Sequence, residues 1–236
     1  MHKLILPEPL HALLNGIEAS AITNFYGAAG TGKTNICLLA ALDCMRNGGQ
    51  CIYIDTEGGF SGERLAQLGG EGFLEKITLV EPKTFAEQSN LINELKNKKT
   101  DLIVLDSAVA LYRLEYAEPV DATNAKKLKE QRDRQIMDAN RELSRQLSIL
   151  STIAREKDIP VIITAHTFKN WETGMQEVVG GEVIKYWSKA IVYLERTGKM
   201  SERKATIFKH RFMEEGKSVK LMIVKEGIKP SGFRIF

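Results

Sequence analysis

Residues 27–34 read Gly-Ala-Ala-Gly-Thr-Gly-Lys-Thr, from Gly27 to Thr34, and this stretch decides the fold. It matches the pattern G-x-x-x-x-G-K-[ST] at every fixed position. Glycines permit a tight loop whose backbone N–H groups point inward at phosphate oxygens. An apolar stretch at 21–26 precedes the loop and a helical pattern at 33–47 follows it. The loop is therefore expected to connect a strand to a helix whose positive N-terminal end faces the phosphates.

The pattern assigns the residues of this loop to the binding of ATP and Mg²⁺. Lys33 is expected to reach the β- and γ-phosphates, and the Thr34 hydroxyl to bind Mg²⁺. The guanine-specific Asn/Thr-Lys-x-Asp motif is absent from the sequence, which favours adenine. The predicted nucleotide-binding residues are Gly27, Ala28, Ala29, Gly30, Thr31, Gly32, Lys33 and Thr34.

Two carboxylates at predicted strand ends complete the expected site. Asp106 ends the apolar run Leu-Ile-Val-Leu-Asp, where an acid holds Mg²⁺ in phosphate-loop proteins. Glu57 follows the candidate strand 51–55 and is expected to deprotonate the attacking water. A Glu beside the second acid would be the alternative base, but Ser107 stands there, so the assignment moves to Glu57. Asp55 is interpreted as structural.

Strands and helices are predicted to alternate through the first two thirds of the chain. Apolar runs between turn residues predict strands at 21–26, 51–55, 77–81, 101–106 and 161–165. Periodicity and capping residues predict helices at 33–47, 62–68, 84–98 and 130–157. This alternation predicts an α/β fold with a mostly parallel central sheet flanked by helices. The sheet would be extended by C-terminal antiparallel hairpin strands at 190–195, 204–210 and 219–224.

Three segments carry no such pattern. Residues 107–130 and 167–181 are predicted to be loops, the first charged and the second rich in glycine. Residues 1–19 are interpreted as a short preamble with turn residues. Because the sequence has no linker, repeat or low-complexity segment, residues 1–236 are expected to form a single domain.

The charge is distributed unevenly. The net charge of +3 does not by itself indicate a nucleic-acid binder. Residues 199–225, however, hold eight Lys/Arg against three Glu, which suits either an anionic partner or a solvated lysine-rich surface. No apolar run approaches the length of a membrane span and the N-terminus lacks a signal-peptide pattern, so a cytoplasmic protein is expected. Three cysteines without a Cys-x-x-Cys pair predict reduced, buried thiols.

Taken together, the motifs resemble the ATPase core of the RecA/RadA recombinase family, and within it the short archaeal RadA paralogues. The resemblance covers nearly all of the chain and rests on residues 21–34, 53–58 with 63–65, 106–113 and 180–181. It implies a RecA-like P-loop NTPase core that binds ATP, hydrolyses it weakly and acts in DNA repair and homologous recombination. Single-stranded DNA is the implied ligand. RadA recombinase, a Holliday-junction resolvase and further copies of the chain are the implied protein partners.

Two features separate this sequence from full-length recombinases. Because the given sequence starts almost at the ATPase core, the helix-hairpin-helix domain and the polymerising linker of full recombinases are expected to be missing, so filament formation and strand exchange do not follow from the resemblance. His166 also stands where recombinases carry a Gln that senses the γ-phosphate. A histidine donates or accepts according to its protonation, so weaker or pH-dependent coupling of ATP to DNA is one reading. A satisfied strand-end histidine is the other.

A third departure is Lys209-His-Arg211, on a predicted late strand. In related hexameric ATPases a Lys-x-Arg pair reaches the γ-phosphate of the neighbouring subunit, where a guanidinium stabilises transition-state charge. Lys209 and Arg211 would otherwise contact DNA phosphates or belong to a plain surface. With Lys33, Glu57 and His166 they form the candidate catalytic set.

Single-stranded DNA binding is assigned to the two predicted loops, where basic and aromatic residues alternate. The candidates are Arg113, Lys126, Lys127, Lys129, Phe168, Lys169 and Trp171. The expected binding is independent of sequence and strongly dependent on salt. Two other functions remain open: a KaiC-like or DnaB-like oligomeric ATPase whose turnover drives subunit motion, and an adaptor in which ATP only stabilises the fold.

Overall fold

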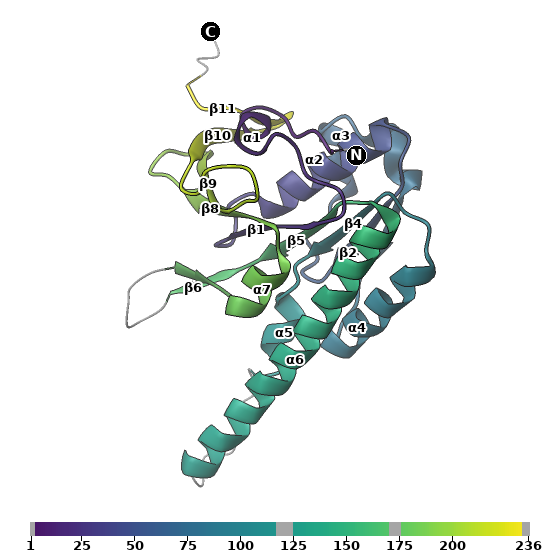
Figure 1. Ribbon diagram of the computed structural model, residues 1–236. Helices are drawn as coiled ribbons and strands as arrows, with labels where there is room; N and C mark the ends of the chain where they lie inside the picture. Colours follow the sequence, from purple (N-terminus) through teal and green to yellow (C-terminus); the bar gives the residue numbers. More distant parts are fainter. Residues whose placement is uncertain (1–2, 117–124, 170–175, 233–236) are drawn as a thin grey trace.

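The computed structural model describes residues 3–116, 125–169 and 176–232 (Figure 1). Within them a twisted sheet has the strand order β11-β10-β9-β8-β1-β5-β4-β2-β3. The parallel strands are β1 (Ile22–Gly27), β2 (Cys51–Asp55), β3 (Ile77–Val80), β4 (Leu102–Asp106), β5 (Val161–Ala165) and β8 (Ala190–Arg196). The antiparallel strands are β9 (Glu202–Lys209), β10 (Ser218–Val224) and β11 (Gly227–Pro230). The predicted α/β fold, with antiparallel strands added at the C-terminal edge, is confirmed.

Helices cover both faces of the sheet because its inner strands are apolar on both sides. One face packs against α1 (Leu10–Leu14), α2 (Lys33–Arg46) and α3 (Gly62–Gln67). The other packs against α4 (Phe85–Glu94), α5 (Ala110–Leu114), α6 (Ala125–Lys157) and α7 (Gly181–Trp187). The alternation of strand side chains is visible in β1, where Phe25 enters the first core and Tyr26 the second. Cys37, Cys44 and Cys51 are buried in the first core, as predicted.

The prediction of loops at 107–130 and 167–181 was wrong in part. Helix α5 and the first turns of α6 lie in the first segment, and the Ser107 hydroxyl accepts a bond from the Ala110 N–H at the start of α5. The second segment contains an antiparallel pair, β6 (Thr167–Lys169) and β7 (Gln176–Val178). Helix α5 has five residues and strands β6 and β7 have three each, which is too short to produce a recognisable periodicity. Only tertiary packing reveals them.

Helix α1, strand β11 and a 3₁₀ helix at Glu71–Lys76 were not predicted either. The expected preamble contains α1, whose Leu10, Leu13 and Leu14 are fully buried against the first core. Strand β11 pairs with β10 and extends the hairpin region by one strand. In both cases short apolar runs lie between turn residues, which on sequence alone also fit a loop.

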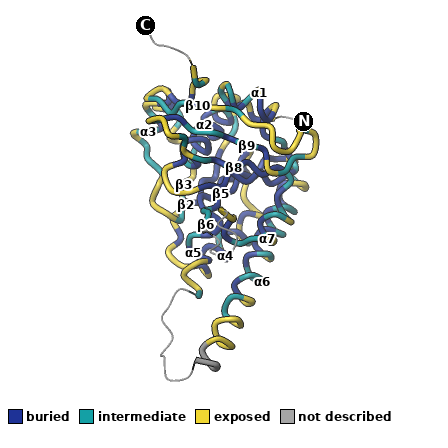
Figure 2. Tube along the Cα trace, turned by 90° about the vertical axis from the view of Figure 1, so that its left-hand side faces the viewer, coloured by how far each residue is buried: buried dark blue, intermediate teal, exposed yellow. Residues whose placement is uncertain are grey.

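Helix α6 projects beyond the sheet (Figures 1 and 2). Its C-terminal half buries Leu143, Leu147 and Leu150 at the spacing of one helical face. Residues 129–134 are exposed and almost all charged, so they have no apolar stripe to bury. The exposed residues 129–134 therefore extend past α5 and away from both cores.

Candidate nucleotide site and the adjoining cavities

The phosphate loop connects β1 to α2, as the sequence predicted. Gly32 is the N-cap of α2 and has a φ of +99°, a left-handed conformation that favours glycine. A Cβ at Gly32 would also lie only 2.7 Å from Cδ1 of Ile223. The N-terminal end of α2 therefore opens directly into the loop, which is the arrangement that binds a phosphate.

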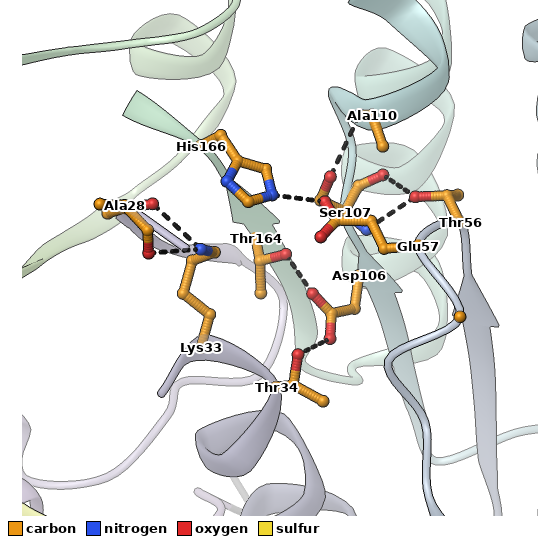
Figure 3. Close-up of polar contacts among 12 residues, drawn as sticks. Ala28, Lys33, Thr34, Thr56, Glu57, Asp106, Ser107, Ala110, Thr164 and His166 are labelled. Carbon is orange, nitrogen blue, oxygen red and sulfur yellow. Dashed lines mark hydrogen bonds and ion pairs between the residues drawn. The ribbon is translucent and has the colours of Figure 1, made fainter. Parts of the chain in front are cut away.

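Lys33 lies inside the mouth of this loop. Its Nζ donates to the carbonyl oxygens of Gly27, at 3.0 Å, and Ala28, at 3.1 Å (Figure 3). The side chain is buried, and burial lowers the pKa of the ammonium, while the nearby carboxylates of Glu57 and Asp106 oppose that shift. A buried cation whose hydrogen bonds go to carbonyl groups rather than to a carboxylate is well placed to exchange them for phosphate oxygens.

Asp106 gathers three hydroxyl groups around its carboxylate. Oδ2 accepts from Thr34 Oγ1 at 2.7 Å and from the Tyr53 hydroxyl at 2.9 Å. Oδ1 accepts from Thr164 Oγ1 at 2.5 Å (Figure 3). A hydroxyl and a carboxylate oxygen side by side are the hard oxygen ligands that suit Mg²⁺, so Thr34 and Asp106 fit the ion that the sequence assigned to them.

Glu57 and His166 are hydrogen-bonded to each other at the same end of the sheet. His166 Nε2 lies 2.7 Å from Glu57 Oε1, and the side chains are only 20% and 32% exposed. Burial alone would raise the pKa of Glu57, but hydrogen bonds from His166 and Ser107 and the positive charges nearby hold it below its ordinary value. Glu57 is therefore an ionised and already bonded carboxylate in this structure.

The loop that carries Glu57 is held from both sides. Asp55 accepts three backbone N–H bonds, from Glu57, Gly58 and Phe60, which supports its interpretation as a structural residue. On the other side, the Thr56 hydroxyl both donates to the Ser107 carbonyl and accepts from its N–H, each at 2.8 Å. Glu57 is thus fixed relative to Asp106, the residue before Ser107.

A cavity of about 540 Å³ adjoins the Glu57–His166 pair. Arg113 of α5 and Arg132 of α6 also line it, so two guanidinium groups lie beside the candidate base. A second cavity, of about 500 Å³, lies between α5, α6 and the β6–β7 hairpin and shares Arg113. Phe168 lines this second cavity and is 45% exposed. Of the predicted DNA-binding residues, the structure brings Arg113 and Phe168 together.

Among the other predicted DNA-binding residues, only Lys129 has a side chain that the structure describes, and it lines neither cavity. Lys129 is exposed on the projecting end of α6. Lys126 and Lys127 lie in the first turn of α6 and Lys169 on β6, but their side chains are outside the described part of the chain. Trp171 lies outside the described residues altogether.

Lys209 and Arg211 lie away from the chain's own phosphate loop. In the sheet register Lys209 pairs with Ile191, which pairs with Asn24 near the start of β1 rather than with its loop end. Lys209 Nζ donates to the Lys185 carbonyl of α7 at 2.6 Å, and Arg211 is exposed. Neither residue serves the nucleotide site of its own chain in this arrangement, so the predicted catalytic role would require a second copy.

Several residues around the site were not anticipated from the sequence. Thr164 and Tyr53 bind Asp106, and the only signal for them is their position one strand away on each side of β4. Tyr112 and Tyr116 line the second cavity, and their rings belong to the segment that was expected to be a loop. No helix within the described ranges is long and apolar enough to cross a membrane.

Comparison with known proteins places this geometry in a family. The Rad51 family profile matches residues 8–231. The chain is 35% identical to the DNA repair and recombination protein RadB of Methanobrevibacter smithii, over 96% of this chain and 95% of that protein. It is 40% identical to the protein of the same name from Methanococcus maripaludis, over 93% and 96%.

Among solved structures, the chain is similar to the RadB recombinase, with a TM-score of 0.72 and 31% sequence identity over 94% of this chain and 96% of that one. Sequence and fold therefore agree, and both agree with the resemblance drawn from the motifs. The chain belongs to the Rad51 family and, within it, to the RadB group of DNA repair and recombination proteins.

Proposed function

We propose that this protein binds ATP with Mg²⁺ in the loop 27–34 and that the bound nucleotide controls its affinity for single-stranded DNA. The observation that carries the proposal is the convergence of Lys33, Thr34, Asp106 and Glu57 at the carboxyl ends of β1, β2 and β4. In open α/β sheets this end of the strands is where ligands bind. ATP would supply the phosphoryl group, and Mg²⁺ held by Thr34 and Asp106 would neutralise its charge.

Hydrolysis by this site is proposed to be slow. A general base works best when its pKa lies near the operating pH, because the base must both be ionised and accept a proton readily. Hydrogen bonds from His166 and Ser107 hold the pKa of Glu57 below its ordinary value, so its carboxylate is a poor proton acceptor. The His166 bond also occupies an oxygen that would otherwise face the attacking water. This supports a weak ATPase rather than a vigorous motor.

Single-stranded DNA is proposed to bind across the two cavities beside this site. Arg113 and Arg132 offer charge for the phosphates, while Phe168 and the neighbouring tyrosines offer faces on which bases stack. Since Arg113 and His166 line one cavity, a DNA phosphate there would lie next to the group that pairs with Glu57. The strand would thereby act on the same pair as the nucleotide, and this contiguity supports coupling between the two ligands.

The protein is proposed to modulate homologous recombination through these two ligands. RadA recombinase and a Holliday-junction resolvase are the proposed protein partners, and assembly with further copies of the chain is proposed as well. A role of Lys209 and Arg211 on the nucleotide of a neighbouring copy belongs to this last proposal.

The DNA proposal is tested by the anisotropy of a fluorescent single-stranded oligonucleotide over a series of salt concentrations. We expect affinity to fall steeply with salt for the wild type. Arg113→Ala should bind several-fold more weakly and give a shallower salt dependence, because one phosphate contact is lost. Arg155→Ala is the matched control, since Arg155 is exposed at the far end of α6 and bonds only to the Ser151 carbonyl among the contacts of the described residues. Equal binding by both variants would place the DNA elsewhere, and no binding by the wild type at low salt would remove DNA from the proposal.

A further inference from the structure

Two arginines lie against the outer side of the phosphate loop although they belong to no nucleotide-binding motif. Arg203 donates to the Gly30 carbonyl oxygen from Nε, at 3.1 Å, and from Nη2, at 3.0 Å. Arg196 Nη2 donates to the Ala29 carbonyl oxygen at 3.4 Å. The two guanidinium groups therefore bind consecutive carbonyl groups at the apex of the loop.

The two arginines face each other across the β8–β9 hairpin. The antiparallel register pairs Arg196 directly with Arg203. Like charges in directly opposed positions destabilise an antiparallel pair. Among the ion pairs of the described residues, none joins either arginine to a carboxylate. This repulsion is offset by the bonds to the Ala29 and Gly30 carbonyl oxygens and by a bond from Arg203 Nη1 to the Glu202 carbonyl oxygen at 2.9 Å.

The hairpin that carries the arginines is fastened at its turn. Glu202 is 2% exposed and accepts a bond from Thr197 Oγ1 at 2.7 Å. Its other carboxylate oxygen accepts a bond from the Ser231 hydroxyl. These two bonds tie the ends of the turn to each other and to the segment after β11. The turn between β8 and β9 is therefore held in place, and with it the two arginines that contact the phosphate loop.

Peptide geometry links the outer carbonyls to the inner N–H groups. The Ala29 carbonyl shares a peptide group with the Gly30 N–H, and the Gly30 carbonyl shares one with the Thr31 N–H, which in this structure makes a long bond of 3.4 Å to the Ala28 carbonyl oxygen. A loop that points its N–H groups at phosphate must point these carbonyls outward. A cation bound to a carbonyl oxygen polarises the whole peptide group, which makes its N–H a stronger donor.

We propose that Arg203, assisted by Arg196, is a positioning residue that holds the apex of the phosphate loop in its phosphate-binding shape and strengthens its inward N–H groups. This inference rests on the proposed function, since it concerns the same nucleotide site. Gly30, whose carbonyl oxygen Arg203 binds, occupies a variable position of the motif, and its left-handed backbone conformation by itself favours glycine. Gly30 has a φ of +71°, and a Cβ there would lie 2.2 Å from Nη2 of Arg196.

The test compares Arg203→Gln and Arg203→Lys with the wild type by titration of fluorescent N-methylanthraniloyl-ADP with Mg²⁺. Lys204→Ala is the control, because it removes a positive charge from the next residue of β9, where Lys204 pairs with Glu195 at 3.3 Å. Arg203→Gln should weaken binding about tenfold, the size of one charge-assisted hydrogen bond. Arg203→Lys should recover part of the affinity, because it keeps the charge but not the two-point contact.

The rate of backbone amide hydrogen exchange at residues 28–32, measured without nucleotide, is a second measurement of the order of the loop and does not depend on ligand binding. If Arg203 and Arg196 clamp the apex of the loop as proposed, exchange should be faster in Arg203→Gln than in Lys204→Ala at equal thermal stability. Unchanged affinity in Arg203→Gln together with unchanged exchange would overturn the inference. If the wild type binds no nucleotide, the proposed function fails, and faster exchange in Arg203→Gln would still support the clamp whereas equal exchange would refute it. Should Arg203→Gln not fold, the same comparison is made with Arg203→Lys, for which exchange and affinity equal to the wild type would again refute the clamp.

Discussion

At the scale of single residues, Glu57 is the group whose surroundings bear most directly on turnover. Burial raises its pKa, but the hydrogen bonds of His166 and Ser107 and the neighbouring charges prevail and lower it from the ordinary value of 4.5. A carboxylate with a lowered pKa stabilises the fold above its unfolded pKa and loses that contribution as the pH falls through the folded value. The stability of the protein at acid pH therefore depends on whether Glu57, in the proposed nucleotide site, is ionised.

Replacing Glu57 by Gln should therefore change the acid limb of stability. At neutral pH we expect Glu57→Gln to be less stable by about 1 kcal/mol, the net value of a hydrogen bond to the carboxylate. Below about pH 4.5 the difference from the wild type should shrink, because the wild-type carboxylate becomes protonated as well. Urea unfolding at several pH values measures this, with the exposed Glu94→Gln as control. A difference that stays constant down to about pH 3 would show that the pKa of Glu57 is not lowered in the fold.

At the same scale, the sequence identified the residues whose chemistry follows from their place in a motif. Lys33 and Thr34 follow from the loop pattern, and Asp106 from its position at the end of an apolar strand. Thr164, Arg196 and Arg203 follow from no local pattern, because they reach the site from strands that are distant in sequence. Their contribution appears only when the strand order is known.

At the scale of elements, α4 shows how local sequence sets a helix boundary. The Thr84 side chain accepts from the Glu87 N–H at 3.1 Å, and Glu87 Oε2 accepts from the Lys83 N–H at 2.7 Å. Thr84, the first residue of the predicted helix 84–98, is thus the N-cap of α4, and Glu87 reaches back to the residue before the cap rather than to the cap itself. Helix α5 and the β6–β7 hairpin have no capping pattern of this kind in the sequence, so their residues were expected to form loops.

Thr84→Ala should lower the free energy of unfolding by about 1 kcal/mol, because the Glu87 N–H loses its acceptor. Thr84→Ser keeps the hydroxyl and should retain most of the stability. Denaturant unfolding measures both. Helix α4 packs on α6, away from the phosphate loop, so nucleotide affinity should be unchanged in either variant. Equal stability of the Ala and Ser variants would mean that the cap does not fix the start of α4.

At the scale of the whole molecule, the strand order brings the phosphate loop and the cavities proposed to bind DNA to the same end of the sheet. The alternation of strands and helices predicted the parallel sheet, and with it the meeting of the loop, Glu57 and Asp106. The cavities beside them were not predictable, because they form between α5, the projecting α6 and the β6–β7 hairpin. That residues 1–236 form a single domain stays a prediction.

This arrangement is the basis of the proposed coupling between nucleotide and DNA. His166 is the link, since it pairs with Glu57 and its carbonyl accepts from the Val179 N–H next to β7. If nucleotide binding moved the Glu57 side chain, His166 would move with it and would shift the base of the hairpin that carries Phe168. Two ligands that act on one element change each other's affinity reciprocally.

The most direct test is the affinity for a fluorescent single-stranded oligonucleotide with and without ATP and Mg²⁺, in the wild type and in Lys33→Ala. We predict that ATP changes the affinity of the wild type by at least about fivefold, the lower range of typical coupling between sites, and that Lys33→Ala abolishes this change while still binding DNA. The same affinity with and without ATP in the wild type, at a nucleotide concentration shown to saturate the site, would show that nucleotide and DNA are not coupled in this protein.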